Sequence, residues 1–335
     1  MASPSTEWKE VVTPDEERRF QRYADGFVAF QRTRSQRYGD GRALHRKQIM
    51  GLRAFVDVLP DLPAHAAHGL FTSPGRHNAV IRLSNASMDV HPDKVPDIRG
   101  FAIKVFDVSG PGALGGNTEE QDFVLINLPT FRVPTSEPFA GVVLARARGE
   151  GATVRYLLRR YKFAFLREVR RGVASLRWPF SGFATEPFHS AVPFACGPYA
   201  ARLRIVPREP GDAAVDARED WAADMRQRLE HAAMVFDMQL QFFVDERITP
   251  IENASVDWPQ DESPYIAVAT LTIPQQVTTG DIGERLEAEV ERLSFDPWHA
   301  LAEHRPLGEV MRARKVAYYA SFKTRSEPAP VSAAG

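Results

Sequence analysis

The chain has 335 residues, of which 44% are hydrophobic and 25% charged, proportions that are ordinary for a globular protein. Its 42 basic residues nearly balance its 43 acidic ones, so net charge gives no reason to expect binding to nucleic acid or to an anionic membrane. A single cysteine, Cys196, excludes an intramolecular disulfide framework and fits a reducing compartment. The N-terminal segment lacks an apolar signal core, and no apolar run approaches the ~18 residues of a membrane span, so we expect a soluble, cytoplasmic protein.

The first half of the chain changes from a helical to a strand-like pattern. Residues 16–34 predict an amphipathic helix, because large apolar side chains recur there at roughly helical spacing. From about residue 80 the pattern becomes strand-like, with β-rich runs at residues 99–108 and 121–128. A glycine-rich loop at residues 110–116 separates these two runs.

The second half adds helices and two further strands. The predicted helices cover residues 150–178, 214–235, 279–293 and 307–323. Strand-like blocks lie at residues 200–206 and 264–273, and we expect the Pro/Ala/Ser-rich tail at residues 326–335 to be disordered. No internal repeat or linker divides the chain. We therefore predict one α+β domain over residues 1–325, built on an antiparallel barrel with helical insertions.

The strand at residues 80–84 carries the first candidate functional side chains. Alternation puts Val80, Arg82 and Ser84 on one face and the intervening apolar residues on the other. If this face is buried, Arg82 needs an anionic partner and Ser84 a polar one, since an unpaired buried charge is costly. The pattern is equally consistent with a strand that exposes this face to solvent.

Two other positions combine with this strand. His45 alone would most often be a surface or satisfied core histidine, but a hydroxyl such as that of Ser84 could hold its ring neutral and oriented for proton transfer. Arg314 and Tyr318 lie four residues apart in a predicted helix, so their side chains can touch. The guanidinium of Arg314 would favour the phenolate form of Tyr318, which is the form of a tyrosine that can bind ferric iron. The alternative is an ordinary Arg–Tyr stacking pair. Tyr319 points in a different direction on the helix.

Five short motifs, in order, resemble those of the haem catalase superfamily over roughly residues 40–325. They stand here as Arg42-Ala43-Leu44-His45-Arg46-Lys47, Ile81-Arg82-Leu83-Ser84, Asp97-Ile98-Arg99-Gly100-Phe101-Ala102-Ile103-Lys104, Gln121-Asp122-Phe123-Val124-Leu125-Ile126-Asn127-Leu128-Pro129 and Arg314-Lys315-Val316-Ala317-Tyr318. The chain looks most like the short catalase-related peroxidases, or minicatalases, and more distantly like the catalase-like allene oxide synthases. The resemblance implies a catalase-like antiparallel β-barrel core with surrounding helices, and haem b as the cofactor.

The resemblance also implies roles for particular residues. Tyr318 would be the axial ligand of the haem iron, a ligand type that catalase exemplifies. The remaining cofactor-binding residues would be Arg42, Leu44, Arg82, Phe131, Phe139 and Arg314. Of these, Arg42 and Arg82 would bind the haem propionates, and one of the two phenylalanines would pack on the macrocycle. The implied catalytic set is His45, Ser84 and Asn127.

The positions at which this sequence differs from full-length catalases indicate which substrate to expect. An ungapped match puts Ile126 where the family has its distal asparagine, with Asn127 one step further on the opposite face of the strand. Either a bulge returns Asn127 to the pocket or the distal amide is missing. Leu44 and Ala86 stand at two valine positions of the distal pocket and the access channel. We expect a wider channel that weakens dismutation of hydrogen peroxide and admits bulkier hydroperoxides.

The sequence therefore predicts a haem peroxidase that reduces organic hydroperoxides, and weakly hydrogen peroxide, with small-molecule electron donors and little true catalase activity. The alternatives are a fatty-acid hydroperoxide dehydratase of the allene oxide synthase type and a non-catalytic haem-binding protein. Full-length relatives are typically tetramers, so a homo-oligomer is compatible with the resemblance. We expect neither a nucleic-acid partner nor stable membrane insertion.

Two further features lie outside this pattern. Residues 155–177 contain eight basic residues against the single acid Glu168. Such a segment suits an anionic membrane, a solvated surface helix, or a subunit contact facing acids such as those at positions 284, 287 and 291. His65 and His68 lie three apart without an evident third metal ligand, and we treat them as loop residues.

Overall fold

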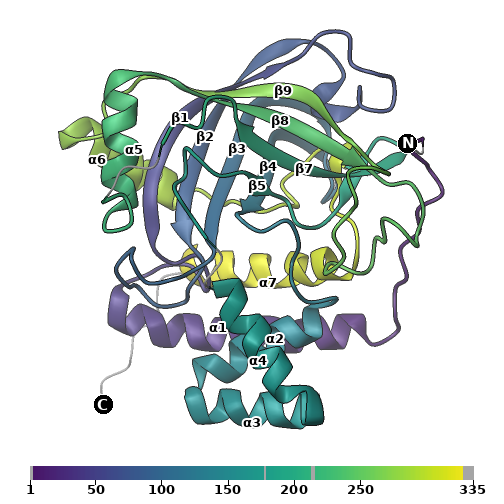
Figure 1. Ribbon diagram of the computed structural model, residues 1–335, viewed down its shortest axis with the longest axis vertical. Coiled ribbons are helices and arrows are strands. Elements are labelled where there is room, and N and C mark those ends of the chain that lie inside the picture. Colours follow the sequence, from purple (N-terminus) through teal and green to yellow (C-terminus); the bar gives the residue numbers. More distant parts are fainter. Residues whose placement is uncertain (1–2, 177–178, 213–215, 327–335) are drawn as a thin grey trace.

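A closed antiparallel barrel forms the centre of the molecule (Figure 1). The computed structural model describes residues 3–176, 179–212 and 216–326. The strands are β1 (Gln48–Val58), β2 (Gly75–Asn85), β3 (Arg99–Pro111), β4 (Asn117–Ile126), β5 (Phe188–His189), β6 (Phe194–Cys196), β7 (Tyr199–Pro207), β8 (Met234–Phe242) and β9 (Tyr265–Ile273). They pair in the order β5-β4-β3-β2-β1-β9-β8-β7, and β5 also pairs with β7, which closes the ring; β6 extends the sheet beside β7.

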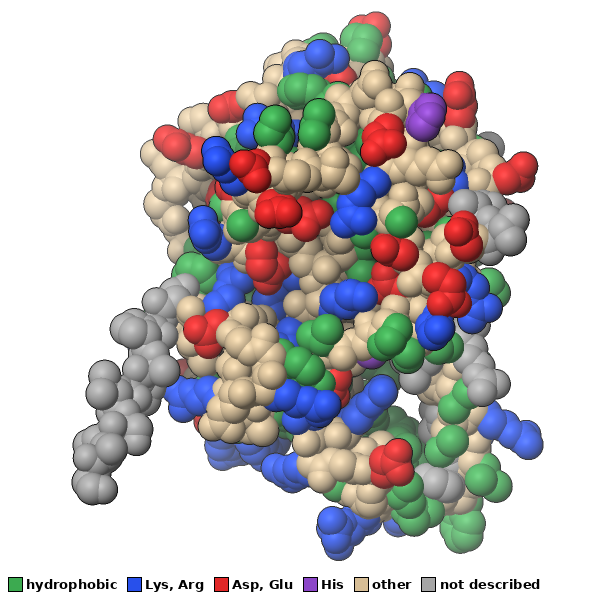
Figure 2. Space-filling model, turned by 90° about the vertical axis from the view of Figure 1, so that its left-hand side faces the viewer, with side chains coloured by type: hydrophobic (Ala, Val, Ile, Leu, Met, Phe, Trp, Pro, Cys, Tyr) green, Lys and Arg blue, Asp and Glu red, His purple; other side chains and the backbone are tan. Residues whose placement is uncertain are grey.

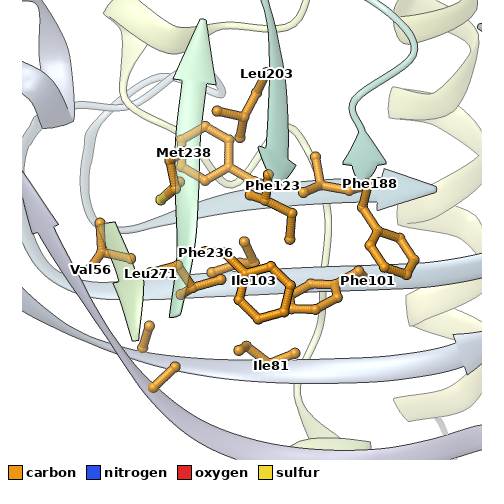
Figure 3. Close-up of a cluster of buried hydrophobic side chains, with 14 of the residues drawn as sticks. Val56, Ile81, Phe101, Ile103, Phe123, Phe188, Leu203, Phe236, Met238 and Leu271 are labelled. Carbon is orange, nitrogen blue, oxygen red and sulfur yellow. The ribbon is translucent and has the colours of Figure 1, made fainter. Parts of the chain in front are cut away.

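The interior of the barrel is filled by side chains. Inward positions along the strands alternate with outward ones, and the inward set is apolar and almost fully buried. Figure 3 shows part of this core: Val56, Ile81, Phe101, Ile103, Phe123, Phe188, Leu203, Phe236, Met238 and Leu271. A barrel of eight strands is just wide enough for such a filling. A large ligand must therefore bind outside the barrel.

Helices surround the barrel. They are α1 (Glu16–Tyr38), α2 (Ser136–Ala147), α3 (Glu150–Tyr161), α4 (Phe165–Leu176), α5 (Trp221–His231), α6 (Gly280–Arg292) and α7 (Glu309–Ser326), with short 3₁₀ turns η1 (Gly69–Phe71), η2 (Lys162–Ala164) and η3 (Ala302–His304). Helices α5 and α6 lie beside β1, and the other helices lie beneath the barrel in the view of Figure 1. Helices α1 and α7 run along each other beneath the barrel, whereas α3 and α4 project from the far side of this layer (Figure 1). Apolar side chains of α1, including Phe20 and Phe27, pack with Ala313 of α7.

The α+β barrel and most predicted elements are confirmed, with two corrections. The predicted helix over residues 150–178 is two helices, because Lys162 adopts a left-handed φ of +44° that an α-helix cannot continue. The predicted helix over residues 214–235 starts only at Trp221, and its end belongs to β8, where apolar and polar residues alternate with the period of a strand. Strands β1, β5 and β6 and helix α2 were not predicted. Residues 327–335 of the predicted tail lie outside the described residues.

A buried ion pair anchors the segment that follows α6. Lys104 and Asp122, each 2% exposed, lie on the outer faces of β3 and β4 with Nζ 2.8 Å from Oδ1. The other carboxylate oxygen of Asp122 accepts a hydrogen bond of 2.8 Å from the backbone N–H of Asp296. Phe295, next to this backbone contact, lines the cavity described below. The ion pair therefore helps to place one wall of the site.

We predict that Lys104→Met destabilises the protein by about 3–5 kcal/mol, because it leaves the Asp122 carboxylate buried without its cation. Urea unfolding at neutral pH measures the change. The matched control is Lys94→Met, which removes an ion pair with Glu219 in which both side chains are more than half exposed; we expect a change of at most about 1 kcal/mol. Equal effects of the two substitutions would show that burial of the pair is not decisive.

Candidate functional site

A large cavity lies between the outer face of β2–β4 and the helices α1, α2 and α7. It encloses about 1420 Å³ of empty space, including its opening to solvent. The predicted site residues that line it are Arg42, Leu44, His45, Arg82, Ser84, Phe131, Phe139, Arg314 and Tyr318. Residues far apart in the chain thus meet at one site, as the sequence predicts.

His45 is fixed by three hydrogen bonds. Its ring Nδ1 lies 3.0 Å from the Ser84 hydroxyl, its backbone N–H donates to the Ala86 carbonyl, and its own carbonyl accepts from Arg82 Nη2 at 2.9 Å. These contacts hold His45 at a left-handed φ of +52°, which is uncommon outside glycine. With Nδ1 engaged by Ser84, Nε2 is the nitrogen that can exchange a proton with a ligand in the cavity.

The His45 ring is neutral at physiological pH. Burial in the cavity wall, reinforced by the positive charge of Arg82, lowers the pKa of His45 to about 4. The imidazole can therefore accept a proton over the whole neutral range. Because the nearby positive charge disfavours imidazolium, a proton taken up by this ring is easily given away again.

Gly100 provides the space for the His45–Ser84 pair, a role that the sequence motif does not reveal by itself. It lies on β3 directly opposite Ser84 of β2. A Cβ atom at this position would lie 2.5 Å from His45 Nδ1 and 2.6 Å from Ser84 Oγ. Glycine within a strand often marks such a close approach. Only the residue without a side chain allows this pair to form here.

Tyr318 and Arg314 form the opposing wall, on α7. Arg314 Nη2 donates a hydrogen bond of 2.7 Å to the Tyr318 hydroxyl, one helical turn away. Tyr318 lines the cavity, whereas the side chain of Tyr319 is 66% exposed. Of the two adjacent tyrosines, the one that the sequence favours therefore faces the cavity.

Two phenylalanines supply an apolar wall. The ring centroids of Phe131 and Phe139 lie 4.8 Å apart at 46°, one ring from the loop after β4 and the other from α2. Leu44 lines the same cavity. Together they offer hydrocarbon and aromatic surface suited to a flat apolar ligand.

An arginine cluster forms one edge of the cavity. Arg82 Nε lies 2.8 Å from Glu291 Oε2, Arg42 also contacts this carboxylate, and Arg325 Nη1 donates to the Glu291 backbone carbonyl at 3.0 Å. Two guanidinium groups thus share the Glu291 carboxylate, and a third binds the backbone carbonyl of the same residue. Burial and the neighbouring Arg82 lower the pKa of Arg42, which reflects the crowding of positive charge. The described lining contains four arginines and no acid, so this edge is suited to anionic groups.

Arg325 and Glu291 were missed as site residues. Arg325 follows Tyr318 by seven positions, two helical turns along the same face of α7, which is the signal that could have identified it. Glu291 was considered as an acid facing another subunit. It instead binds the arginines of its own chain.

Asn127 does not reach the cavity. Its Oδ1 accepts a hydrogen bond of 2.8 Å from the backbone N–H of Arg99, and its own N–H donates to the Arg99 carbonyl. Strand β4 pairs with β3 without a register shift from Glu120 to Ile126, which lies opposite Gly100 and lines the cavity. The structure therefore shows no bulge that turns Asn127 into the cavity, and β4 contributes no side-chain amide to the cavity wall.

The remaining candidates lie away from this cavity. Cys196 is buried, which raises the pKa of its thiol to about 12, as expected for an unreactive core residue. Among the described residues, no cluster of His, Cys, Asp or Glu is arranged to hold a metal ion, and His65 packs against Phe242. No described helix is long and apolar enough to cross a membrane.

Comparison with known proteins identifies the architecture. No family model and no curated protein matches the chain. Solved structures do: catalase A from Saccharomyces cerevisiae (TM-score 0.68, 15% identity, 97% of this chain), a fungal catalase (0.66, 16%, 88%) and a bacterial catalase (0.63, 15%, 97%). The chain spans 67%, 62% and 63% of the length of these three proteins, respectively.

These similarities define the class of the protein as an antiparallel β-barrel with surrounding helices. More particularly, the chain has the catalase fold. Assignment to the short, minicatalase branch stays a prediction.

We predict that Gly100→Ala destabilises the protein by about 1–3 kcal/mol, because the added methyl group overpacks the His45–Ser84 contact. Urea unfolding measures the loss. Gly172→Ala is the control, since a Cβ there meets no atom within 4 Å and α4 gains a better helix former. If both substitutions are neutral, the close approach at Gly100 does not constrain the site.

Proposed function

We propose that the cavity binds haem b and that the protein is a peroxidase acting on organic hydroperoxides. The observation that carries this proposal is that Tyr318, hydrogen-bonded by Arg314, and His45, oriented by Ser84, line one cavity. His45 and Ser84 lie on the barrel side and Tyr318 on the helix side. Tyrosine is a rare axial ligand of haem iron, and catalase is the example of its use.

The residues present fit a haem. Tyr318 offers the oxygen ligand, and the guanidinium of Arg314 would stabilise negative charge on that oxygen. Arg42, Arg82 and Arg325 would hold the two propionates, since their cluster carries more positive charge than Glu291 balances. The rings of Phe131 and Phe139, with Leu44, would pack on the macrocycle.

When bound, haem supplies the redox chemistry that cleaves the O–O bond of a peroxide. The part of this chain is to manage the proton. His45 would accept the proton of the hydroperoxide at Nε2 and return it to the departing oxygen, with Ser84 keeping the ring in place. Small-molecule reductants would complete turnover.

The cavity wall supports organic hydroperoxides as substrates. Ile126 and Leu44 present hydrocarbon where a polar amide would assist a small, strongly hydrated peroxide. The resulting apolar surface suits an alkyl group. We therefore propose weak activity with hydrogen peroxide and little true catalase activity.

The first test compares ferric absorption spectra of the purified protein and two variants. We expect Tyr318→Phe to lose the high-spin charge-transfer features of tyrosinate ligation, because it removes the ligand oxygen. Tyr319→Phe is the matched control, since the adjacent tyrosine is exposed, and its spectrum should equal that of the wild type.

Either of two results would count against haem ligation by Tyr318: no defined spectrum after addition of hemin to the wild type, or an unchanged spectrum of Tyr318→Phe. In the first case the likeness to catalases would be one of fold only.

The second test measures turnover of an organic hydroperoxide with an added reductant. We expect His45→Ala to lower the rate by roughly 10²–10⁴-fold, as for removal of a general acid–base. The wild-type rate should be constant above about pH 5 and fall as the pH approaches the His45 pKa of about 4, because imidazolium cannot accept a proton.

His231→Ala serves as the control, because His231 is exposed on α5. An undiminished rate in His45→Ala would eliminate its catalytic role and favour a haem-binding protein without catalysis. Formation of an epoxide-derived ketol from a lipid hydroperoxide, without consumption of reductant, would favour the dehydratase.

A further inference from the structure

Helices α3 and α4, joined by η2, form a projection that we call the basic arm. It extends away from the barrel, beyond the layer of α1 and α7 (Figure 1), and none of the side chains of α3 is buried. Its tip exposes large apolar side chains: Phe163 is fully exposed and Leu166 is 71% exposed. Val154, Leu158 and Val173 are also exposed along its two helices. Isolated exposed apolar residues are common, but this many on one projection mark an interaction site.

The same arm is strongly cationic. Arg155, Arg159, Lys162 and Arg170 are exposed between the apolar residues, and Figure 2 shows basic and hydrophobic side chains together on the lower projection. From residue 155 to residue 177 the sequence contains one acid, Glu168. Cations surrounding an apolar surface are typical of helices that lie in the headgroup region of anionic membranes.

The base of the arm contacts α2. Tyr156 of α3 packs on Gly141, where an added Cβ would lie only 2.1 Å from the tyrosine hydroxyl oxygen. Arg160 of α3 forms an ion pair of 3.9 Å with Glu137 of α2. Phe139 and Ala140, also on α2, line the cavity. The arm thus packs on the helix layer that bounds the cavity.

We propose that the basic arm docks the protein on an anionic lipid surface. Phe163 and Leu166 enter the boundary between headgroups and acyl chains, while the arginines bind lipid phosphates. This inference does not depend on what the cavity binds.

A second copy of the chain fits the arm less well. Two of the acids that could face it are already paired within their own chain: Glu291 with Arg42 and Arg82, and Glu287 with Arg226 at 3.9 Å. A protein surface would also have to bury the apolar tip together with the cations around it. A lipid surface satisfies both at once, because headgroup phosphates lie directly above hydrocarbon.

The test is flotation of the purified full chain with vesicles of phosphatidylcholine alone or with about 30% phosphatidylglycerol. We expect binding to the anionic vesicles only, weakened as salt rises. The double variant Phe163→Ser with Leu166→Ser should lower partitioning at least tenfold, by roughly the apolar contribution of the tip. The triple variant Arg155→Gln, Arg159→Gln and Arg170→Gln should lower it about 100-fold, since each basic residue near such a surface contributes about fivefold.

The matched control is Ile282→Ser with Arg285→Gln on α6, an exposed apolar and basic pair away from the arm, which should bind as the wild type does. Unchanged melting temperatures would show that the arm variants are folded. Binding by both arm variants at the wild-type level, or no binding by the wild type, would overturn the proposal.

A second measurement reports on the tip directly. Phe163→Cys can be labelled selectively with an environment-sensitive dye, because Cys196 is buried and the pKa of its thiol is raised to about 12. We expect a blue shift on addition of anionic vesicles and none for dye at Ile282→Cys. An oligomer in lipid-free light scattering that the arm variants abolish, without a dye response to lipid, would instead identify a subunit contact and refute membrane docking.

Discussion

The site depends on one buried guanidinium, that of Arg82. This side chain is 2% exposed and on an outward position of β2, so it must find its partners inside the protein. It finds the carbonyl of His45 and the carboxylate of Glu291. The first contact holds His45 at a backbone conformation that few side chains adopt, and the second ties α6 to the barrel. The charge of Arg82 also contributes to keeping the His45 ring neutral. Arg82 thus contributes to both the position and the protonation of the histidine.

Closure of the barrel determines where such a site can lie. Because bulky side chains such as Phe101 and Phe236 fill the interior, no room remains there for a large ligand. The binding cavity therefore lies on the outer face of β2–β4. The elements that enclose it must be apolar where they contact these strands. Helices α1, α2 and α7 are these elements, and α7 brings Tyr318 to the same space as His45. The buried pair of Lys104 and Asp122 holds a further wall in place.

Sequence alone predicted the parts of this site that follow from local periodicity. Alternation along residues 80–84 placed Arg82 and Ser84 together, and helical spacing paired Arg314 with Tyr318. It could not decide whether a bulge turned Asn127 inward, because a bulge depends on pairing with a neighbouring strand. Nor could it show Gly100 as a constraint, since the clash it avoids is with a side chain from another segment. The break of the helix at Lys162 has no glycine or proline to announce it.

Charge in the cavity explains why the proposed chemistry can use a histidine that titrates far below neutral pH. Burial disfavours a positive charge on the His45 ring, and the charges of Arg82, Arg314 and Arg42 add to this effect. Such a ring binds a proton weakly and for a short time, which suits a relay between two oxygens of one substrate and does not suit a storage site. Ser84 keeps the ring orientation constant while its charge changes. The arginines that would bind the anionic edge of a cofactor therefore also adjust the proton affinity of the base beside it.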